Sequence, residues 1–153
     1  IRLLSRRTRE LNQKLNAVQA ERQERDLSNM AGWFWYRTEE HSQMDTLTQY
    51  RQHIQNLLKE HASLVWDTRI SAETIFDTEH DHYQLVYVGW RNSKRVYGVV
   101  LHLDIIDNKI WIQQDGTEIG IANKLVDLGI PKTNIVLAFD PPNLRKYTDF
   151  AVS

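Results

Sequence analysis

Residues that can pack in a core recur after Met44 with the spacing of one helix face. They are Leu47, Tyr50, Ile54, Leu57, Leu58 and His61. This i, i+3, i+4 rhythm is typical of an amphipathic helix packed along one side. Asp45 is a plausible N-cap, because its side chain can accept a hydrogen bond from the first helical turn. We therefore predict a helix from Met44 that ends near residues 62–64.

After this helix, the chain changes to the alternating pattern of β-strands. Four strands are predicted, at residues 70–77, 82–90, 95–106 and 109–114. Polar turns separate them, at residues 78–81, 92–93 and 107–108. The last two turns, Asn92-Ser93 and Asp107-Asn108, contain residues that tolerate positive φ, which favours tight two-residue hairpins.

Closing both hairpins on these turns predicts which residues share a face of the sheet. The face that we expect to form the core collects Val86, Val88, Trp90, Val99, Leu101, Leu103, Ile105, Ile110 and Ile112. The second face collects Tyr83, Leu85, Tyr87, Val100, His102, Asp104, Trp111 and Gln113. A slip of one residue would exchange the two faces, so the assignment depends on an unbroken register.

The rest of the chain predicts one more helix and one more strand. Asp115-Gly116-Thr117-Glu118 has capping-box spacing, and Gly129 followed by Pro131 marks the end of a helix. Residues 133–139 are typical of a fifth strand, and residues 144–152 of a short extended tail. The order α-β-β-β-β-α-β predicts an α+β fold, an antiparallel meander sheet of four to five strands with two helices on one face.

Residues 1–43 have a different pattern and are predicted to form an N-terminal helical extension. A narrow apolar stripe at helical spacing lies among basic residues: Leu4, Leu11, Leu15 and Val18. We favour a solvated or coiled-coil helix over a basic arm for nucleic acid or membranes, because acidic residues interrupt the basic ones. Residues 28–43 are predicted to be a linker. Its four aromatics, residues 33–36, need cover from the main domain or a partner.

Charge separates the same two segments. Residues 1–27 carry seven Lys and Arg against four Asp and Glu, whereas residues 44–153 carry eleven against fourteen. DNA-binding domains usually show a basic face or a high pI, so this balance disfavours autonomous DNA binding by residues 44–153. The absence of cysteine excludes disulfides and thiolate metal sites and fits a cytoplasmic protein. No apolar run reaches the roughly 20 residues of a membrane helix, so we expect no membrane contact.

Blocks of residues 44–153 match one known family in order. They lie at residues 44–52, 75–79, 81–85, 88–90, 95–98, 102–105, 109–113, 116–118, 125–132, 135–137 and 147–152. These blocks, which include Val88-Gly89-Trp90 and Lys109-Ile110-Trp111-Ile112-Gln113, resemble the XisI family, the fdxN element excision controlling factors. Met44 lies where members of that family begin. Residues 1–43 fall outside the resemblance, and we expect them to be an alternative start, a fusion junction or an added leader.

The resemblance implies a controlling role rather than catalysis. Members of the family are accessory factors for excision of a DNA element during cyanobacterial heterocyst development, beside XisH and a separate recombinase. The resemblance brings no catalytic residues, so we expect a non-enzymatic factor with no cofactor and no metal. We expect a XisH-like protein as partner, a homo-oligomer, and contact with DNA only indirectly, through a recombination complex.

The second sheet face is the candidate interface, because it is too apolar for a solvated surface. Its candidate residues are Tyr83, Leu85, Tyr87, His102, Asp104, Trp111 and Gln113. Tyrosine and tryptophan beside a few polar groups are typical of protein interfaces. An identical subunit, a XisH-like partner or the aromatics of residues 33–36 could cover this face.

Two other functions stay open. A DNA-binding accessory module could use the turn at residues 91–95, the C-terminal tail or the N-terminal extension. A small metal-dependent hydrolase or nuclease could centre on Asp77, His82, His102 and Asp104, since imidazole and carboxylate bind divalent ions. We favour a hydrogen-bonded polar surface over a metal site, because these residues form no fixed motif.

Overall fold

The computed structural model describes residues 2–153, with the side chains of 2–6 and 33–36 outside the description. The elements are α1 (Arg2–Ser63), β1 (Ile70–Asp77), β2 (His82–Arg91), β3 (Lys94–Ile106), β4 (Lys109–Asp115), α2 (Ile121–Asp127), η1 (Lys132–Asn134), β5 (Ile135–Leu137) and η2 (Arg145–Tyr147). The chain divides into two compact units, Ile1–Asp45 and Thr46–Ser153.

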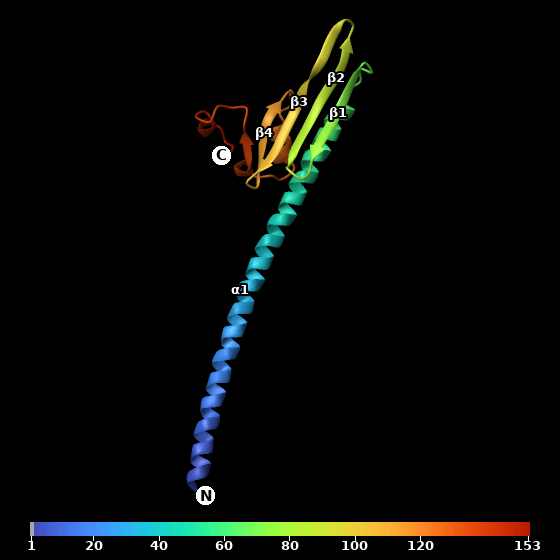
Figure 1. The fold of residues 1–153 in the computed structure, drawn as a ribbon. Helices are drawn as coiled ribbons and strands as arrows, with labels where there is room; N and C mark the ends of the chain where they lie inside the picture. The colour runs from blue at the N-terminus through green and yellow to red at the C-terminus, as the bar shows by residue number, and fades with distance from the viewer. Residues whose placement is uncertain (1) are drawn as a thin grey trace. The chain divides into compact units, whose positions relative to one another are not determined.

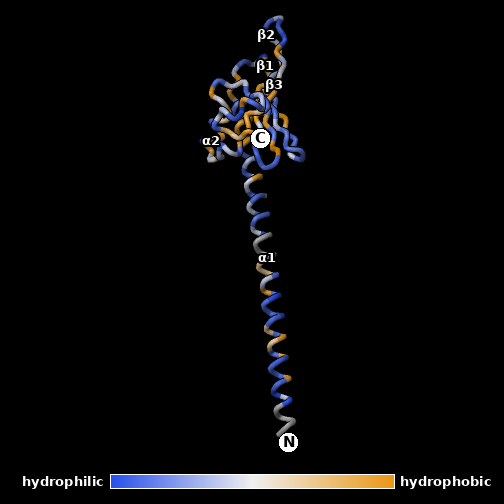
Figure 2. The backbone as a smooth tube through the Cα atoms, turned by 90° about the vertical axis from the view of Figure 1, so that its left-hand side faces the viewer, coloured by the Kyte–Doolittle hydropathy of each residue, from blue (hydrophilic) through white to orange (hydrophobic). Residues whose placement is uncertain are grey.

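One continuous helix, α1, stands where the sequence predicted a helix, a linker and a second helix. Residues 2–63 contain no proline and only one glycine, so nothing in them forces the helix to end. The linker prediction is therefore wrong, and Asp45 lies inside the helix rather than at its N-cap. Hydrophilic positions predominate along the first unit (Figure 2), and Leu11, Leu15 and Val18 are exposed there.

The predictions for Leu4 and for the cover of the aromatics at 33–36 concern side chains outside the described residues. Within the described part of the chain, no helix has an apolar stretch long enough to cross a bilayer.

Five strands form one sheet in the order β1-β2-β3-β4-β5 (Figure 1). Strands β1 to β4 pair antiparallel, each with the next. Strand β5 pairs parallel with β4, because the connection between them passes through α2 and so returns the chain in the same direction. The α+β class and the element order are confirmed, and the sheet is mostly rather than wholly antiparallel.

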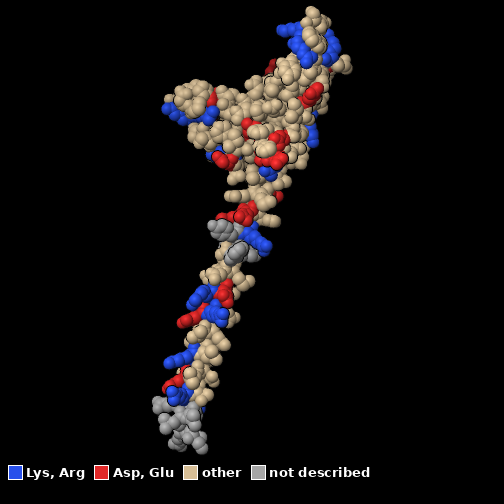
Figure 3. Space-filling view, viewed as in Figure 1, with Lys and Arg blue, Asp and Glu red and all other residues tan. Residues whose placement is uncertain are grey.

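Both predicted two-residue hairpins are confirmed. Asn92, Asp107 and Asn108 have φ of 55°, 50° and 61°, the left-handed conformation that asparagine and aspartate tolerate. Lys and Arg side chains gather at the end of the β2–β3 hairpin, which turns at residues 92–93 (Figure 3).

The core lies between the sheet and one layer of helix formed by α2 and residues 46–63 of α1. Its central members are Tyr50, Ile54, Leu57, Leu58, Tyr83, Leu85, Leu101, Leu103, Ile105, Ile110, Ile112, Ile121 and Leu125. The apolar face predicted for the helix after Met44 is therefore confirmed. The helix also ends at Ser63, within the predicted range.

Helix α2 begins later than the capping-box spacing predicted. Asp115 accepts hydrogen bonds from Thr117 N at 2.9 Å and from Ile121 N at 2.7 Å, so its carboxylate closes a turn before the helix. Gly120, at φ 82°, lies between that turn and the helix. The C-terminal signal is confirmed, because Gly129 has φ 92° and Ile130 N donates to Leu125 O at 3.2 Å.

A β-bulge in β3 contradicts the predicted register of the β2–β3 hairpin. Val86 lies opposite Val99 as predicted, but the next pair is Leu85 with Leu101, so Val100 is an extra residue. An extra residue shifts the alternation by one, and every side chain beyond it changes face relative to the neighbouring strand. From Leu101 onward, the predicted core residues of β3 therefore lie on the same side of the sheet as Leu85 and Tyr83.

The bulge divides the predicted core face between the two sides of the sheet. Val88, Trp90 and Val99 lie on the side opposite the helices, so their assignment to the core face is wrong. Val86 lies on the same side and outside the core cluster, although it is buried as predicted. We call this side the outer face. It is formed by Ser71, Glu73, Ile75, Asp77, His82, Gln84, Val86, Val88, Trp90, Arg95, Tyr97, Val99, His102, Asp104, Trp111 and Gln113.

Candidate functional site

The seven predicted interface residues fall on two sides of the sheet. Tyr83 and Leu85 are fully buried in the core, and Tyr87 packs against it, so these three do not belong to an exposed surface. The physical reason is the bulge at Val100, which places them on the helix side. The other four, His102, Asp104, Trp111 and Gln113, lie together on the outer face.

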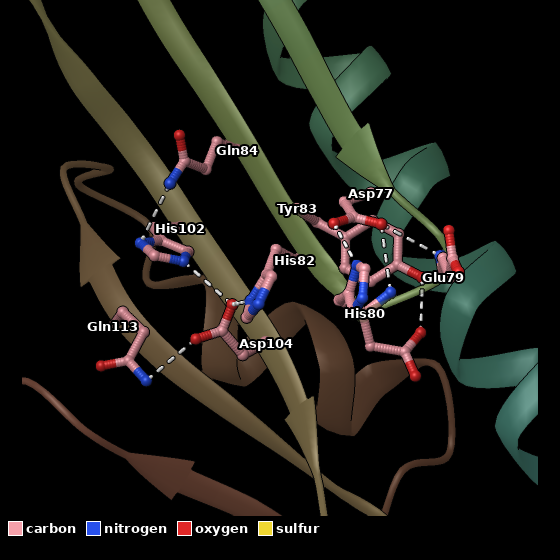
Figure 4. A network of polar contacts seen from close by, with 10 residues as sticks. Asp77, Glu79, His80, His82, Tyr83, Gln84, His102, Asp104 and Gln113 are labelled. Atoms are coloured by element: carbon pink, nitrogen blue, oxygen red, sulfur yellow. Dashed lines mark hydrogen bonds and ion pairs between the residues drawn. The ribbon is translucent and has the colours of Figure 1, made fainter.

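The polar half of the outer face is organised around the buried carboxylate of Asp104 (Figure 4). His82 Nδ1 lies 2.7 Å and His102 Nε2 lies 2.9 Å from the same oxygen, Asp104 Oδ1. Gln113 Nε2 donates to Asp104 Oδ2 at 3.1 Å. A second bulge, in β4, makes Gln113 an extra residue beside the pair His102–Gln114.

One assignment of protons satisfies every hydrogen bond of this network. An ionised Asp104 accepts from His82 Nδ1–H and from His102 Nε2–H, and each imidazole can then be neutral. His102 Nδ1 accepts from Gln84 Nε2 at 3.4 Å. Gln84 was not among the sequence candidates, although it shares the strand alternation of His82. Finding its partner required the position of the bulge.

The carboxylate of Asp104 raises the pKa of His82 above its ordinary value, through the hydrogen bond first and the charge second. Protonated His82 therefore stabilises the fold at pH values below the unfolded pKa of about 6.5, and this contribution is lost as pH rises through the folded pKa. We expect an NMR titration to give His82 a higher pKa in the wild type than in Asp104→Asn, because the substitution removes the carboxylate that accepts its hydrogen bond. An equal pKa of His82 in the two proteins would contradict this geometry.

The other acidic and imidazole candidates form separate contacts around the β1–β2 hairpin. Asp77 accepts from His80 N at 3.0 Å and from its ring at 2.9 Å, which lowers the pKa of Asp77. Asp81 instead accepts hydrogen bonds from Arg51 Nε at 2.7 Å, from Arg51 Nη2 at 2.9 Å and from Tyr83 Oη at 2.9 Å. Asp77 lies opposite His82 in the strand register, and its charge helps to raise the pKa of His82, but no hydrogen bond joins Asp77 to the Asp104 network within the described residues.

The other half of the outer face is apolar and exposed. Trp90 is 54% exposed, Tyr97 73% and Val99 40%, and Ile75 of β1 is also exposed. Arg95 lies over both aromatic rings, with its guanidinium 5.4 Å from Trp90 and 5.6 Å from Tyr97. Such a group of large side chains on one side of a sheet is typical of a contact surface.

The segment after β5 contacts the outer face at β4. Arg145 is only 8% exposed, and its guanidinium lies 5.5 Å from the Trp111 ring. It donates to the carbonyls of Asp140 at 3.0 Å, Ala138 at 3.3 Å and Val152 at 3.4 Å. The tail predicted at residues 144–152 is therefore a folded segment, and Arg145 is a structural residue that the sequence pattern did not reveal.

Comparison with known proteins places this sheet in one family. The family model described as XisI protein matches residues 44–152. A XisI-like protein from Anabaena variabilis is similar to the chain, with 42% identity and a TM-score of 0.67 over 70% of this chain and 99% of that one. A second Anabaena variabilis structure, fdxN element excision controlling factor XisI, has 35% identity and a TM-score of 0.62 over 71% and 99%. A search of curated proteins gave no match.

The family match spans the second compact unit and thus the sheet, both bulges and the outer face. The two similar structures are covered almost completely, at identities well above the level at which only a fold is shared. By its sequence match and by its fold, the chain belongs to the XisI family.

Proposed function

We propose that the chain is a non-enzymatic accessory factor that controls site-specific excision of a DNA element by binding a XisH-like protein through its outer face. A similar solved structure carries the name of an excision controlling factor, which supports the controlling role. This role places the chain in the cytoplasm and brings it to DNA only indirectly, through a recombination complex.

The observation that carries the proposal is the composition of the outer face. Its apolar half combines Trp90, Tyr97 and Val99 with Ile75, all exposed, and its polar half is held in place by Asp104. Rigid aromatic side chains with an ordered set of hydrogen-bonding groups are the usual components of an interface core and its rim. A solvated sheet face has no need of this arrangement.

The polar half supports a binding role better than a catalytic one. The carboxylate and both imidazoles of the Asp104 network are already engaged with one another and with two glutamines. A general base must be able to take a proton from the substrate, and a nucleophile needs such a base beside it. Side chains that are paired with one another are not placed for either role. Asp77 lies opposite His82 in the strand register, but its carboxylate is already bound to His80.

We propose in addition that the chain forms a homo-oligomer. An oligomer that buried the outer face would compete with the XisH-like protein for it. Light scattering of the isolated chain and of Val99→Asp distinguishes an oligomer that uses the outer face from one that does not. Loss of the oligomer in the variant would assign the outer face to a second copy and contradict its assignment to the XisH-like protein.

The test of the proposed function is excision in a cell that lacks its own copy of the protein. We expect the wild-type chain to restore excision, and Val99→Asp to fail because it buries a charge in the contact. Ile119→Asp, at an exposed apolar residue outside the outer face, serves as the matched control and should restore excision. Excision that proceeds equally without the chain would overturn the proposal.

A second candidate function is direct DNA contact by the β2–β3 hairpin. Arg91, Lys94 and Arg95 lie at its end and are exposed, beside the rings of Trp90 and Tyr97. Basic residues next to aromatic ones are typical of nucleic-acid contacts. Asp67 reduces this charge, because it accepts a hydrogen bond from Arg91 at 3.3 Å.

Salt dependence tests this second candidate. Contact of all three basic residues with phosphates gives a slope of log K against log salt of about −2.7, and Lys94→Ala makes the slope less steep by about one unit. Lys146→Ala is the control, since Lys146 is also exposed but lies outside the hairpin. A flat slope for the wild type would exclude direct contact.

A further inference from the structure

Three side-chain atoms of the outer face converge as the ligands of a metal ion do. His82, His102 and Asp104 each offer one ligand atom, and these atoms all lie within 4.8 Å of one another. His82 comes from β2, whereas His102 and Asp104 lie two residues apart on β3 and so point to the same side. Both imidazoles turn toward the same carboxylate oxygen (Figure 4). One pair of neighbouring strands therefore holds all three atoms.

The ligand types select a class of ion. Imidazole suits zinc, copper, nickel and iron, whereas calcium and magnesium prefer oxygen ligands. Three protein ligands of nitrogen and oxygen, with a further position left open, are typical of zinc sites that hold a water molecule or an external group. The chain contains no cysteine, so nitrogen and oxygen are the strong donors that it offers to such an ion.

The distances between the ligand atoms are close to those that a tetrahedral ion requires. Zinc bonds of about 2.0–2.1 Å place neighbouring ligand atoms roughly 3.3 Å apart. The observed separations from Asp104 Oδ1 are 2.7 Å to His82 Nδ1 and 2.9 Å to His102 Nε2. Opening them by about half an ångström is a small side-chain movement, and the His82 side chain is 55% exposed and free to make it.

We propose that His82, His102 and Asp104 form a three-ligand site for a divalent transition-metal ion such as Zn²⁺, with one position open on the outer face. The ion takes the place of the two protons that now join the imidazoles to Asp104 Oδ1. Each neutral imidazole exchanges its N–H toward Asp104 Oδ1 for an N–H at its other ring nitrogen, so the number of protons on the protein does not change. A protonated His82 releases one proton to water when the ion binds.

The surrounding glutamines supply the second layer of contacts that such a site needs. A metal-bound imidazole usually donates its remaining N–H to an oxygen acceptor, which fixes the orientation of the ring. His102 Nδ1 faces the Gln84 amide at 3.4 Å, and a half-turn of that amide presents its oxygen instead of its nitrogen. Gln113 Nε2 donates to Asp104 Oδ2 at 3.1 Å, which leaves Asp104 Oδ1 for the ion.

The metal site lies on the outer face, as the proposed partner contact does, but the two can be tested separately. Its three ligands all belong to this chain, so binding of the ion requires no other protein. Metal binding can therefore be measured on the isolated chain. Failure to bind Zn²⁺ would overturn the metal site and not the proposed function, and failure to bind the partner would overturn the proposed function and not the metal site.

The experiment is calorimetric titration of the full chain with Zn²⁺ after removal of metals by a chelator. We expect one ion per chain and a loss of affinity of more than about 100-fold in His82→Gln, which removes an exposed ligand without disturbing the core. His41→Gln makes the same change on an exposed helix residue and should bind as the wild type does. Co²⁺ absorption in the visible range gives an independent readout of imidazole coordination.

Two further variants extend the test. Gln84→Leu should weaken binding by about 10–100-fold, the loss typical of an outer contact to a ligand. His102→Gln should lose as much Zn²⁺ affinity as His82→Gln, because both histidines are ligands. Equal Zn²⁺ affinity in the wild type and in His82→Gln, or no binding by the wild type at millimolar Zn²⁺, would overturn the proposal.

Discussion

Replacing Leu85 with alanine should lower the free energy of unfolding by about 2–5 kcal/mol, the loss typical of a fully buried leucine. Val99→Ala should lower the free energy of unfolding by less than about 1 kcal/mol, because Val99 is exposed on the outer face and the substitution changes only the strand propensity. Urea denaturation of both variants measures the two losses.

The pair tests the bulge at Val100 directly. An unbroken register would put Val99 in the core and Leu85 on the surface, and so would reverse the order of the two losses. A larger loss for Val99→Ala than for Leu85→Ala would contradict the observed pairing of Leu85 with Leu101.

Arg145→Met should be the second severe change, with a loss of about 2–4 kcal/mol. Methionine keeps part of the packing against Trp111 but leaves the carbonyls of Asp140, Ala138 and Val152 without the guanidinium that now donates to them. Unsatisfied buried carbonyls cost about 1–3 kcal/mol each when no water replaces the donor. Thermal or urea unfolding gives the value.

The neighbouring residue supplies the matched control. Lys146 is exposed and contacts the Tyr147 ring at 5.1 Å, so Lys146→Met should change the free energy of unfolding by no more than about 0.5 kcal/mol. Equal effects of the two variants would mean that Arg145 does not anchor the C-terminal segment.

The sequence predicted the strands well, because alternation and turn residues act locally. The tight turn at Asp107-Asn108 and the helix end at Gly129 follow from backbone conformations that these residue types favour. The face assignment failed because Val99, Val100 and Leu101 are apolar in succession. A run of apolar residues fits either face, so the alternation does not reveal where an extra residue enters the strand.

The candidate site was only partly predictable for the same reason. His102, Asp104 and Trp111 were placed on the correct face, since they follow the bulge in β3 or lie beyond it in β4. Gln84 joins their network only when β2 is shifted by one residue. The sequence did not reveal the structural role of Arg145, because its partners are backbone carbonyls, which any residue supplies.

The measurement that tests the central claim most directly is the affinity of the purified chain for a XisH-like protein from the same cell. We expect the wild type to bind and Val99→Asp to lose at least about 30-fold in affinity, the loss of an interface hot spot worth about 2 kcal/mol. Ile119→Asp should bind as the wild type does, because Ile119 lies outside the outer face. Equal affinity of the wild type and Val99→Asp would contradict the assignment of the outer face as the surface that binds the partner.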